Sequence, residues 1–195
     1  YYQATIRNGR RGSTAVTYLK DAAGRPNLRV ITHAEVEAIA LDDKRASGVR
    51  YSVGGEKRFI KARREVLLAA GAIGSPQILE LSGIGQGEVL KKAGVEVRHE
   101  LKGVGENLQD HYQVRTVYEV TLPYSLNAVW HSPMLQFKTG LQYAFNRQGI
   151  LATGAAVAGV FAKSSPELDE PDIQFHFIPF SADAPGKGLH KYPGV

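Results

Sequence analysis

Short alternating runs of apolar and polar residues fill the first half of the chain. The clearest runs are residues 28–31, 36–41, 47–53 and 57–61. Turn-forming pairs separate several of them, namely Asp42-Asp43 and Gly54-Gly55. Alternation at this spacing predicts half-buried strands that are joined as hairpins.

A different pattern follows at residues 66–70, Val-Leu-Leu-Ala-Ala, where no polar residue interrupts the run. A continuous apolar run bounded by glycine predicts a strand that is buried on both faces. Ser75 is the predicted N-cap of the next helix and Pro76 its first residue, while Gly83 can take the left-handed conformation that ends a helix. The pattern therefore predicts a buried strand–turn–helix.

The second half of the chain mixes helical and extended patterns, so the fold class is α/β, or more loosely α+β. We expect helices over 88–93 and 133–146, and strands over 95–98, 114–121, 155–162 and 172–178. In the last strand Ile173, Phe175 and Phe177 share one face, and Gln174 and His176 share the other. Gln174 and His176 therefore either face water or line a pocket.

Composition narrows the class of protein. At 195 residues, with 43% hydrophobic and 22% charged residues, the chain is typical of a globular protein with a sizeable core. The lack of cysteine excludes disulfide scaffolds and thiolate zinc sites, and we expect no metal site. No apolar run approaches the about twenty residues that a membrane helix needs. We expect a cytoplasmic protein without a transmembrane segment, and leave peripheral membrane association open.

The net charge of +5 is concentrated in two clusters, one formed by Arg7, Arg10 and Arg11 and the other within residues 57–64. Such a face can be ordinary solvated surface, can lie near a cofactor phosphate, or can attract nucleic acid. Aromatic residues are not interleaved with the basic ones, which argues against nucleic acid. We keep one alternative: a non-enzymatic, β-rich binding module that uses its basic face on nucleic acid or an acidic partner.

The glycines from Gly71 to Gly87 match neither a G-x-G-x-x-G fingerprint nor a P-loop, so their spacing alone does not define a cofactor. However, residues 64–85 together with Gly-Val-Gly-Glu-Asn-Leu-Gln-Asp-His at 103–111 resemble the glucose-methanol-choline (GMC) oxidoreductases. Residues 7–16, 27–33 and 171–176 resemble segments of choline dehydrogenase-like members in the same order. The resemblance implies an FAD-dependent flavoprotein that oxidises a primary alcohol to an aldehyde by hydride transfer to flavin N5.

The resemblance also implies a domain organisation. Residues 1–108 would be the later part of the FAD-binding domain, and 109–195 the first part of a substrate domain built from an antiparallel sheet and helices. Such proteins begin with a G-x-G-x-x-G loop and end with a catalytic histidine, and neither is present here. We therefore expect an internal fragment with no catalytic residue of its own, inactive and holding FAD weakly or not at all. Its expected partners are the remaining N- and C-terminal parts of the same protein and a small alcohol, with no nucleic acid.

Three residues are expected to contact FAD by resemblance. Val36 would meet the adenine through its backbone, and Ala70 and Gly71 would pass close to the ribose and diphosphate. Two of these positions have a structural alternative, because Val36 could be a core valine and Gly71 could serve strand-to-helix packing. The loop over residues 103–111 is expected to be structural and near the flavin.

Two residues are expected to line the substrate pocket by resemblance. A histidine matching His176 lines the cavity in choline-oxidising relatives, although a solvent-facing histidine is the alternative. Gln113 stands about where those relatives carry a glutamate that holds the quaternary ammonium. A neutral glutamine gives up that charge attraction, so choline is in doubt as the substrate. Whether the enzyme is a dehydrogenase or an oxidase, and its oligomeric state, stay open.

Overall fold

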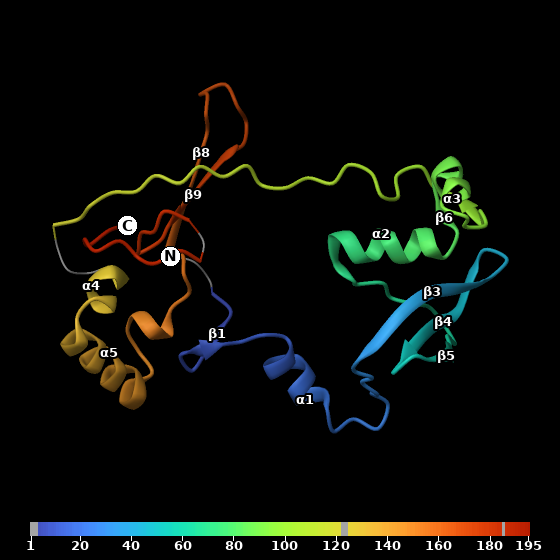
Figure 1. The fold of residues 1–195 in the computed structure, drawn as a ribbon, viewed down its shortest axis with the longest axis horizontal. Helices are drawn as coiled ribbons and strands as arrows, with labels where there is room; N and C mark the ends of the chain where they lie inside the picture. Colours follow the sequence, from blue (N-terminus) through green and yellow to red (C-terminus); the bar gives the residue numbers. More distant parts are fainter. Residues whose placement is uncertain (1–3, 122–124, 185) are drawn as a thin grey trace. The chain divides into compact units, whose positions relative to one another are not determined.

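A computed structural model describes residues 4–121, 125–184 and 186–195 (Figure 1). The chain divides into two compact units. The middle unit is Arg29–Tyr112, and the split unit combines Tyr1–Leu28 with Gln113–Val195. One junction lies close to the predicted boundary at residues 108/109, whereas the first 28 residues belong with the C-terminal part. The assignment of a cofactor domain and a substrate domain stays a prediction.

The middle unit is built on a three-stranded antiparallel sheet in the order β3-β4-β5. Its strands are β3 (Ala34–Asp42), β4 (Arg45–Val53) and β5 (Glu56–Lys61). Tight turns join them, with positive φ at Asp43, Gly54 and Gly55. The predicted hairpins over this region are confirmed.

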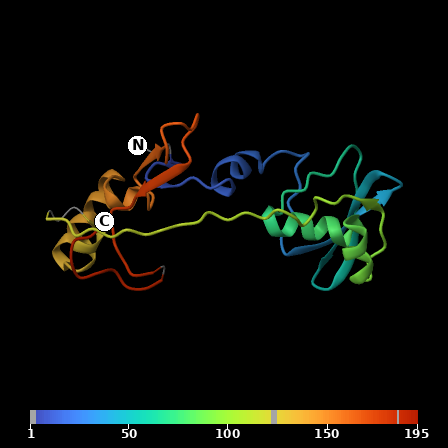
Figure 2. The ribbon, with the colours of Figure 1, turned by 90° about the horizontal axis from the view of Figure 1, so that it is seen from above.

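One helix covers this sheet. Helix α2 (Gly71–Leu81) packs against β3, as both views show (Figures 1 and 2). The chain then forms β6 (Ile84–Gly85), α3 (Gly87–Lys92) and β7 (His99–Glu100), with β6 and β7 paired in parallel. The buried apolar side chains of the unit are those of Ile39, Ala40, Tyr51, Leu90 and Val104.

The predicted strand at residues 66–70 is not formed. This run is irregular, no described strand pairs with it, and the side chain of Leu67 is 83% exposed. A strand forms only where ladder hydrogen bonds join it to a neighbouring strand, and the β3-β4-β5 sheet does not include this segment. The predicted strands over 28–31 and 95–98 are also absent from the described secondary structure.

The split unit starts with a hairpin and continues with short helices. Its first elements are β1 (Ile6–Arg7), β2 (Arg10–Arg11), the π-helical turn η1 (Ala15–Leu19) and α1 (Lys20–Ala22). After residue 124 come α4 (Leu126–Trp130), α5 (Pro133–Asn146), the 3₁₀ turn η2 (Ile150–Ala152), β8 (Ala158–Ala162) and β9 (Ile173–Phe177). Helix α5 has the predicted bounds. The Ser132 hydroxyl caps it by accepting a 3.4 Å hydrogen bond from Leu135 N, and Pro133 is its first residue.

The buried centre of the split unit is polar. Ser125, Asn127 and Ser181 are buried there, whereas none of its described large apolar side chains is. The predicted strand over 114–121 is an extended segment that makes one isolated bridge, Glu119 to Gly194. The composition predicts a sizeable apolar core. Among the described residues, however, the buried apolar side chains form only a small cluster in the middle unit. None of the described helices is long and apolar enough to cross a membrane.

Candidate functional site

Ala70 and Gly71 form the N-terminal end of α2. Ala70 is the N-cap, and Gly71 has φ +86°, a conformation that favours glycine. Ser75 is not the N-cap, because the helix begins five residues before the predicted position, with Ala70 as its N-cap. The Ser75 hydroxyl still satisfies an end group from inside the helix, since it accepts a 3.0 Å hydrogen bond from Ala70 N.

The first turn of α2 offers free backbone donors. The N–H groups of Gly71, Ala72 and Ile73 precede the first intrahelical hydrogen bonds, and no described group accepts from them. The helix dipole adds positive potential at this end. Open space surrounds the position that a Gly71 Cβ would take, with no heavy atom within 4 Å. The residues present therefore fit an anionic group such as a phosphate.

Val36 lies in β3, where the backbone pairing is irregular. It faces Tyr51 of β4, and the register shifts between Val36 and Ala38, which leaves Glu37 as a bulge. The Val36 side chain is exposed rather than buried in the core. Val36 therefore lies at the surface of the middle unit, next to the bulge at Glu37.

The loop over residues 103–111 satisfies its polar groups locally. Asp110 Oδ1 accepts a 2.8 Å hydrogen bond from the backbone nitrogen of His111, and Asn107 has φ +59°. Glu106 accepts from the side chain of Gln86, and Val104 is buried. Side chains that bond to nearby groups in this way favour the structural interpretation of the loop.

His176 lies on β9, and its neighbours follow from the strand register. The antiparallel pairing sets His176 opposite Gly159 of β8 and Gln174 opposite Phe161. The prediction that Gln174 and His176 share one face of the strand is thus confirmed. Gly159 has no side chain, so it leaves room beside His176. Gln113 lies in the exposed, extended start of the second part of the split unit.

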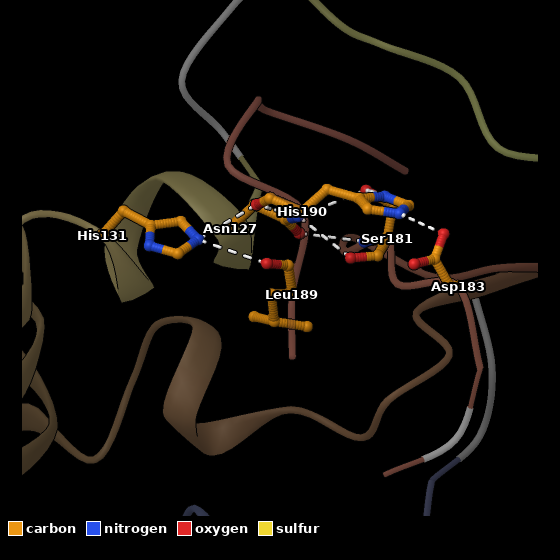
Figure 3. Close-up of polar contacts among 6 residues, drawn as sticks. All are labelled: Asn127, His131, Ser181, Asp183, Leu189 and His190. Atoms are coloured by element: carbon orange, nitrogen blue, oxygen red, sulfur yellow. Dashed lines mark hydrogen bonds and ion pairs between the residues drawn. The ribbon is translucent and has the colours of Figure 1, made fainter. Parts of the chain in front are cut away.

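A buried polar network in the split unit had not been predicted from the sequence (Figure 3). Asn127 Nδ2 donates to the carbonyl oxygens of Ser181 and His190 at 3.0 and 2.9 Å, and its Oδ1 accepts from Ser181 N at 2.9 Å. His131 Nε2 donates to the His190 carbonyl at 3.1 Å. These bonds tie α4 to the segment around Ser181 and His190.

Part of this network resembles a nucleophilic triad. His190 Nδ1 lies 3.1 Å from Ser181 Oγ, and His190 Nε2 lies 3.0 Å from Asp183 Oδ1. The hydrogen bond that His190 donates and, as the smaller cause, the charge of the His190 ring hold the pKa of Asp183 below its usual value. However, Ser181 is only 3% exposed, and a Cβ on Gly194 would come within 1.9 Å of Ser181 Oγ. A substrate carbonyl has no room at that oxygen, so the network is structural.

The fold is similar to those of solved FAD-containing oxidoreductases. A variant of the formate oxidase of Aspergillus oryzae superposes with a TM-score of 0.80 at 22% identity, over 95% of this chain and 37% of its own. The FAD-dependent oxidoreductase of Chaetomium thermophilum gives 0.67 at 29% identity, over 75% of this chain and 26% of its own.

The sequence comparisons define the family. The model of the GMC oxidoreductase family matches residues 1–113, so this chain belongs to the GMC oxidoreductases. The oxygen-dependent choline dehydrogenase of Cronobacter sakazakii is 46% identical over 91% of this chain and 32% of its own length. The enzyme of the same name from Pseudomonas fluorescens is 42% identical over 98% of this chain and 34% of its own. The chain spans about a third of the length of these relatives.

Proposed function

We propose that this chain is part of an FAD-dependent alcohol dehydrogenase or oxidase that converts a primary alcohol to an aldehyde. The observation that carries the proposal is the open, glycine-led first turn of α2 in a chain of the GMC family. When bound, the flavin would accept the hydride from the carbinol carbon. Family membership selects this hypothesis over the non-enzymatic binding module.

The chain's own contribution to the cofactor is backbone positioning. Gly71 and the N–H groups behind it would face the diphosphate, and Ala70 would approach the ribose at the same helix end. Val36 would meet the adenine through its backbone, next to the bulge at Glu37. These roles need backbone geometry rather than particular side-chain chemistry. The most important feature for cofactor contact is therefore the absence of a side chain at Gly71.

The chain's contribution to the substrate would come from the split unit. His176 would present its imidazole to the alcohol beside the small residue Gly159. Gln113 would line the same pocket with a neutral amide. Because an amide offers a cation less attraction than a carboxylate, we propose that a neutral primary alcohol is preferred over choline. A cytoplasmic location, with the remaining parts of the same protein as partners, belongs to this proposal.

Two matched glycine substitutions in the full-length, flavin-loaded protein test the proposal. Gly71→Val and Gly94→Val both place a β-branched residue at positive φ, +86° and +76°, where no heavy atom lies within 4 Å of the new Cβ. The backbone strain is therefore comparable. We expect Gly71→Val to lose most of its bound FAD and its alcohol-dependent flavin reduction, while Gly94→Val keeps both.

Absorbance of the purified proteins gives the flavin-to-protein ratio, and thermal unfolding checks that both variants fold. Equal flavin content in the two variants would remove Gly71 from the cofactor site. A full-length protein that binds no flavin at all would overturn the proposed function itself.

A further inference from the structure

A basic cavity of about 610 Å³ lies in the split unit, beside the β1–β2 hairpin. Its charged lining consists of Arg7, Arg10, Arg11, Lys20, Arg147 and a single carboxylate, Asp21. The cavity therefore gathers five cations against one anion. Its volume falls within the range of small-molecule sites.

The cations around this cavity lack counter-ions among the described residues. None of Arg7, Arg10, Arg11 and Lys20 forms an ion pair or a side-chain hydrogen bond within residues 4–121, 125–184 and 186–195. The hairpin register places Arg7 directly opposite Arg10. Like charges that face each other across two strands destabilise the pairing unless an anion lies between them.

The hairpin and the fifth cation are held in place by specific contacts. Asn8 and Gly9 form its turn with φ +53° and +68°, the two left-handed residues of a two-residue hairpin. Tyr143 Oη donates a 3.1 Å hydrogen bond to Gly9 O, and the Arg147 guanidinium lies 4.9 Å above the Tyr143 ring. The backbone comes so close that a Cβ on Gly9 would lie 2.6 Å from Arg147 O.

We propose that this cavity binds a phosphoryl group. Planar guanidinium groups from both strands and from the end of α5 suit the several oxygens of a phosphate or diphosphate, which they can bind in pairs. A single carboxylate would leave most of these charges uncompensated. The ligand is a free phosphorylated molecule, because the diphosphate of the dinucleotide is assigned to the end of α2 in the middle unit. The proposal does not depend on the enzymatic activity.

Calorimetric titration of the full-length protein with inorganic pyrophosphate tests the site. We expect binding that weakens as salt is added, because the contacts are between exposed charges. Arg10→Gln should lower the affinity about tenfold through loss of one charge-assisted contact, and Arg10→Lys should lower it less. Arg25→Gln is the matched control, because Arg25 is an exposed arginine of the same unit that does not line the cavity.

Comparison of the flavin-loaded with the flavin-stripped protein distinguishes a free phosphorylated ligand from the cofactor. Binding of pyrophosphate to the loaded protein, weakened by Arg10→Gln only, supports a free phosphorylated ligand. Binding to the stripped protein only, together with a lower flavin content in Arg10→Gln, would overturn the proposal, because the cavity would then belong to the cofactor site. If neither form binds pyrophosphate, or if Arg25→Gln weakens binding as much as Arg10→Gln, the proposal is wrong. Unfolding temperatures of the variants confirm that each of them is folded.

Discussion

Ser82 fastens the end of α2 to the middle of β3, because its hydroxyl accepts a 2.8 Å hydrogen bond from the backbone nitrogen of Ile39. The same hydroxyl donates to the carbonyl of Ile78 one turn back in the helix. Ser82 and Ile39 are both buried. A single, largely buried side chain thus joins the helix and the sheet of the middle unit.

Ser82→Ala should therefore destabilise the protein by about 1–3 kcal/mol, because the buried N–H of Ile39 loses its acceptor. Ser52→Ala, on β4 in the same sheet, is the control and should stay within about 0.5 kcal/mol of the wild type. Urea unfolding of both variants measures the difference. An unchanged free energy of unfolding in Ser82→Ala would mean that this bond does not hold the helix.

Asn127→Ala should cost about 2–4 kcal/mol, since it strips partners from the backbone groups of Ser181 and from the His190 carbonyl. Asn146→Ala, at the exposed end of α5, should change the stability by no more than about 0.5 kcal/mol. Hydrogen exchange provides a local measurement, and the amide of Ser181 should lose protection in Asn127→Ala. Retained protection there would contradict the central role of Asn127.

Acid stability should depend on Asp172. The side-chain hydroxyl and then the backbone N–H of Ser164 donate to its carboxylate at 2.6 and 2.7 Å and hold its pKa below the ordinary value of 3.8. A lowered folded-state pKa means that this stabilisation is present above pH 3.8 and is lost as the pH falls through the lower folded value. Asp172→Asn should therefore lose less free energy of unfolding than the wild type as the pH falls below 3.8. Asp169→Asn, in the same loop, should lose as much as the wild type, and urea unfolding at several pH values measures both.

His176→Ala in the full-length enzyme should lower kcat/KM for the primary alcohol by about tenfold or more, the cost of one hydrogen bond to the reacting hydroxyl. Flavin content should not change, which separates a pocket role from misfolding. Gln174→Ala, two residues away on the same face, is the matched variant. Equal losses in the two variants would indicate a general effect on the strand.

Gln113→Glu should raise kcat/KM for choline relative to its uncharged carbon analogue, because a carboxylate attracts the quaternary ammonium. The gain should shrink as salt is added. Gln109→Glu introduces the same charge four residues earlier and should leave the ratio of the two substrates unchanged. A ratio that responds equally to both substitutions would exclude Gln113 from the pocket.

Local patterns account for the elements that were predicted correctly. Alternation with Asp-Asp and Gly-Gly turns specified the hairpins of β3, β4 and β5. The helical spacing of apolar residues from Pro133 onward specified α5. The Asn8-Gly9 pair was also a strong hairpin signal, although no strand was predicted there. Such features act over a few residues, so the sequence displays them directly.

The features that were missed depend on distant partners. Residues 66–70 have the composition of a buried strand, but a strand needs a neighbour, and the local sequence does not say whether one is beside it. Asn127 and Ser181 are 54 residues apart, and no periodicity links a buried amide to its acceptors. The start of α2 was misplaced because Ser75-Pro76 resembles a cap, while Gly71 supports the actual start through backbone freedom alone.

The hydrogen bond between Tyr143 and Gly9 spans 134 residues, and the whole middle unit is inserted between them. During synthesis the β1–β2 hairpin leaves the ribosome long before α5 exists. The middle unit, whose contacts are contained in one continuous stretch, can fold during that interval. The N-terminal hairpin can dock only afterwards, so completion of the split unit should be the late step in the maturation of this chain.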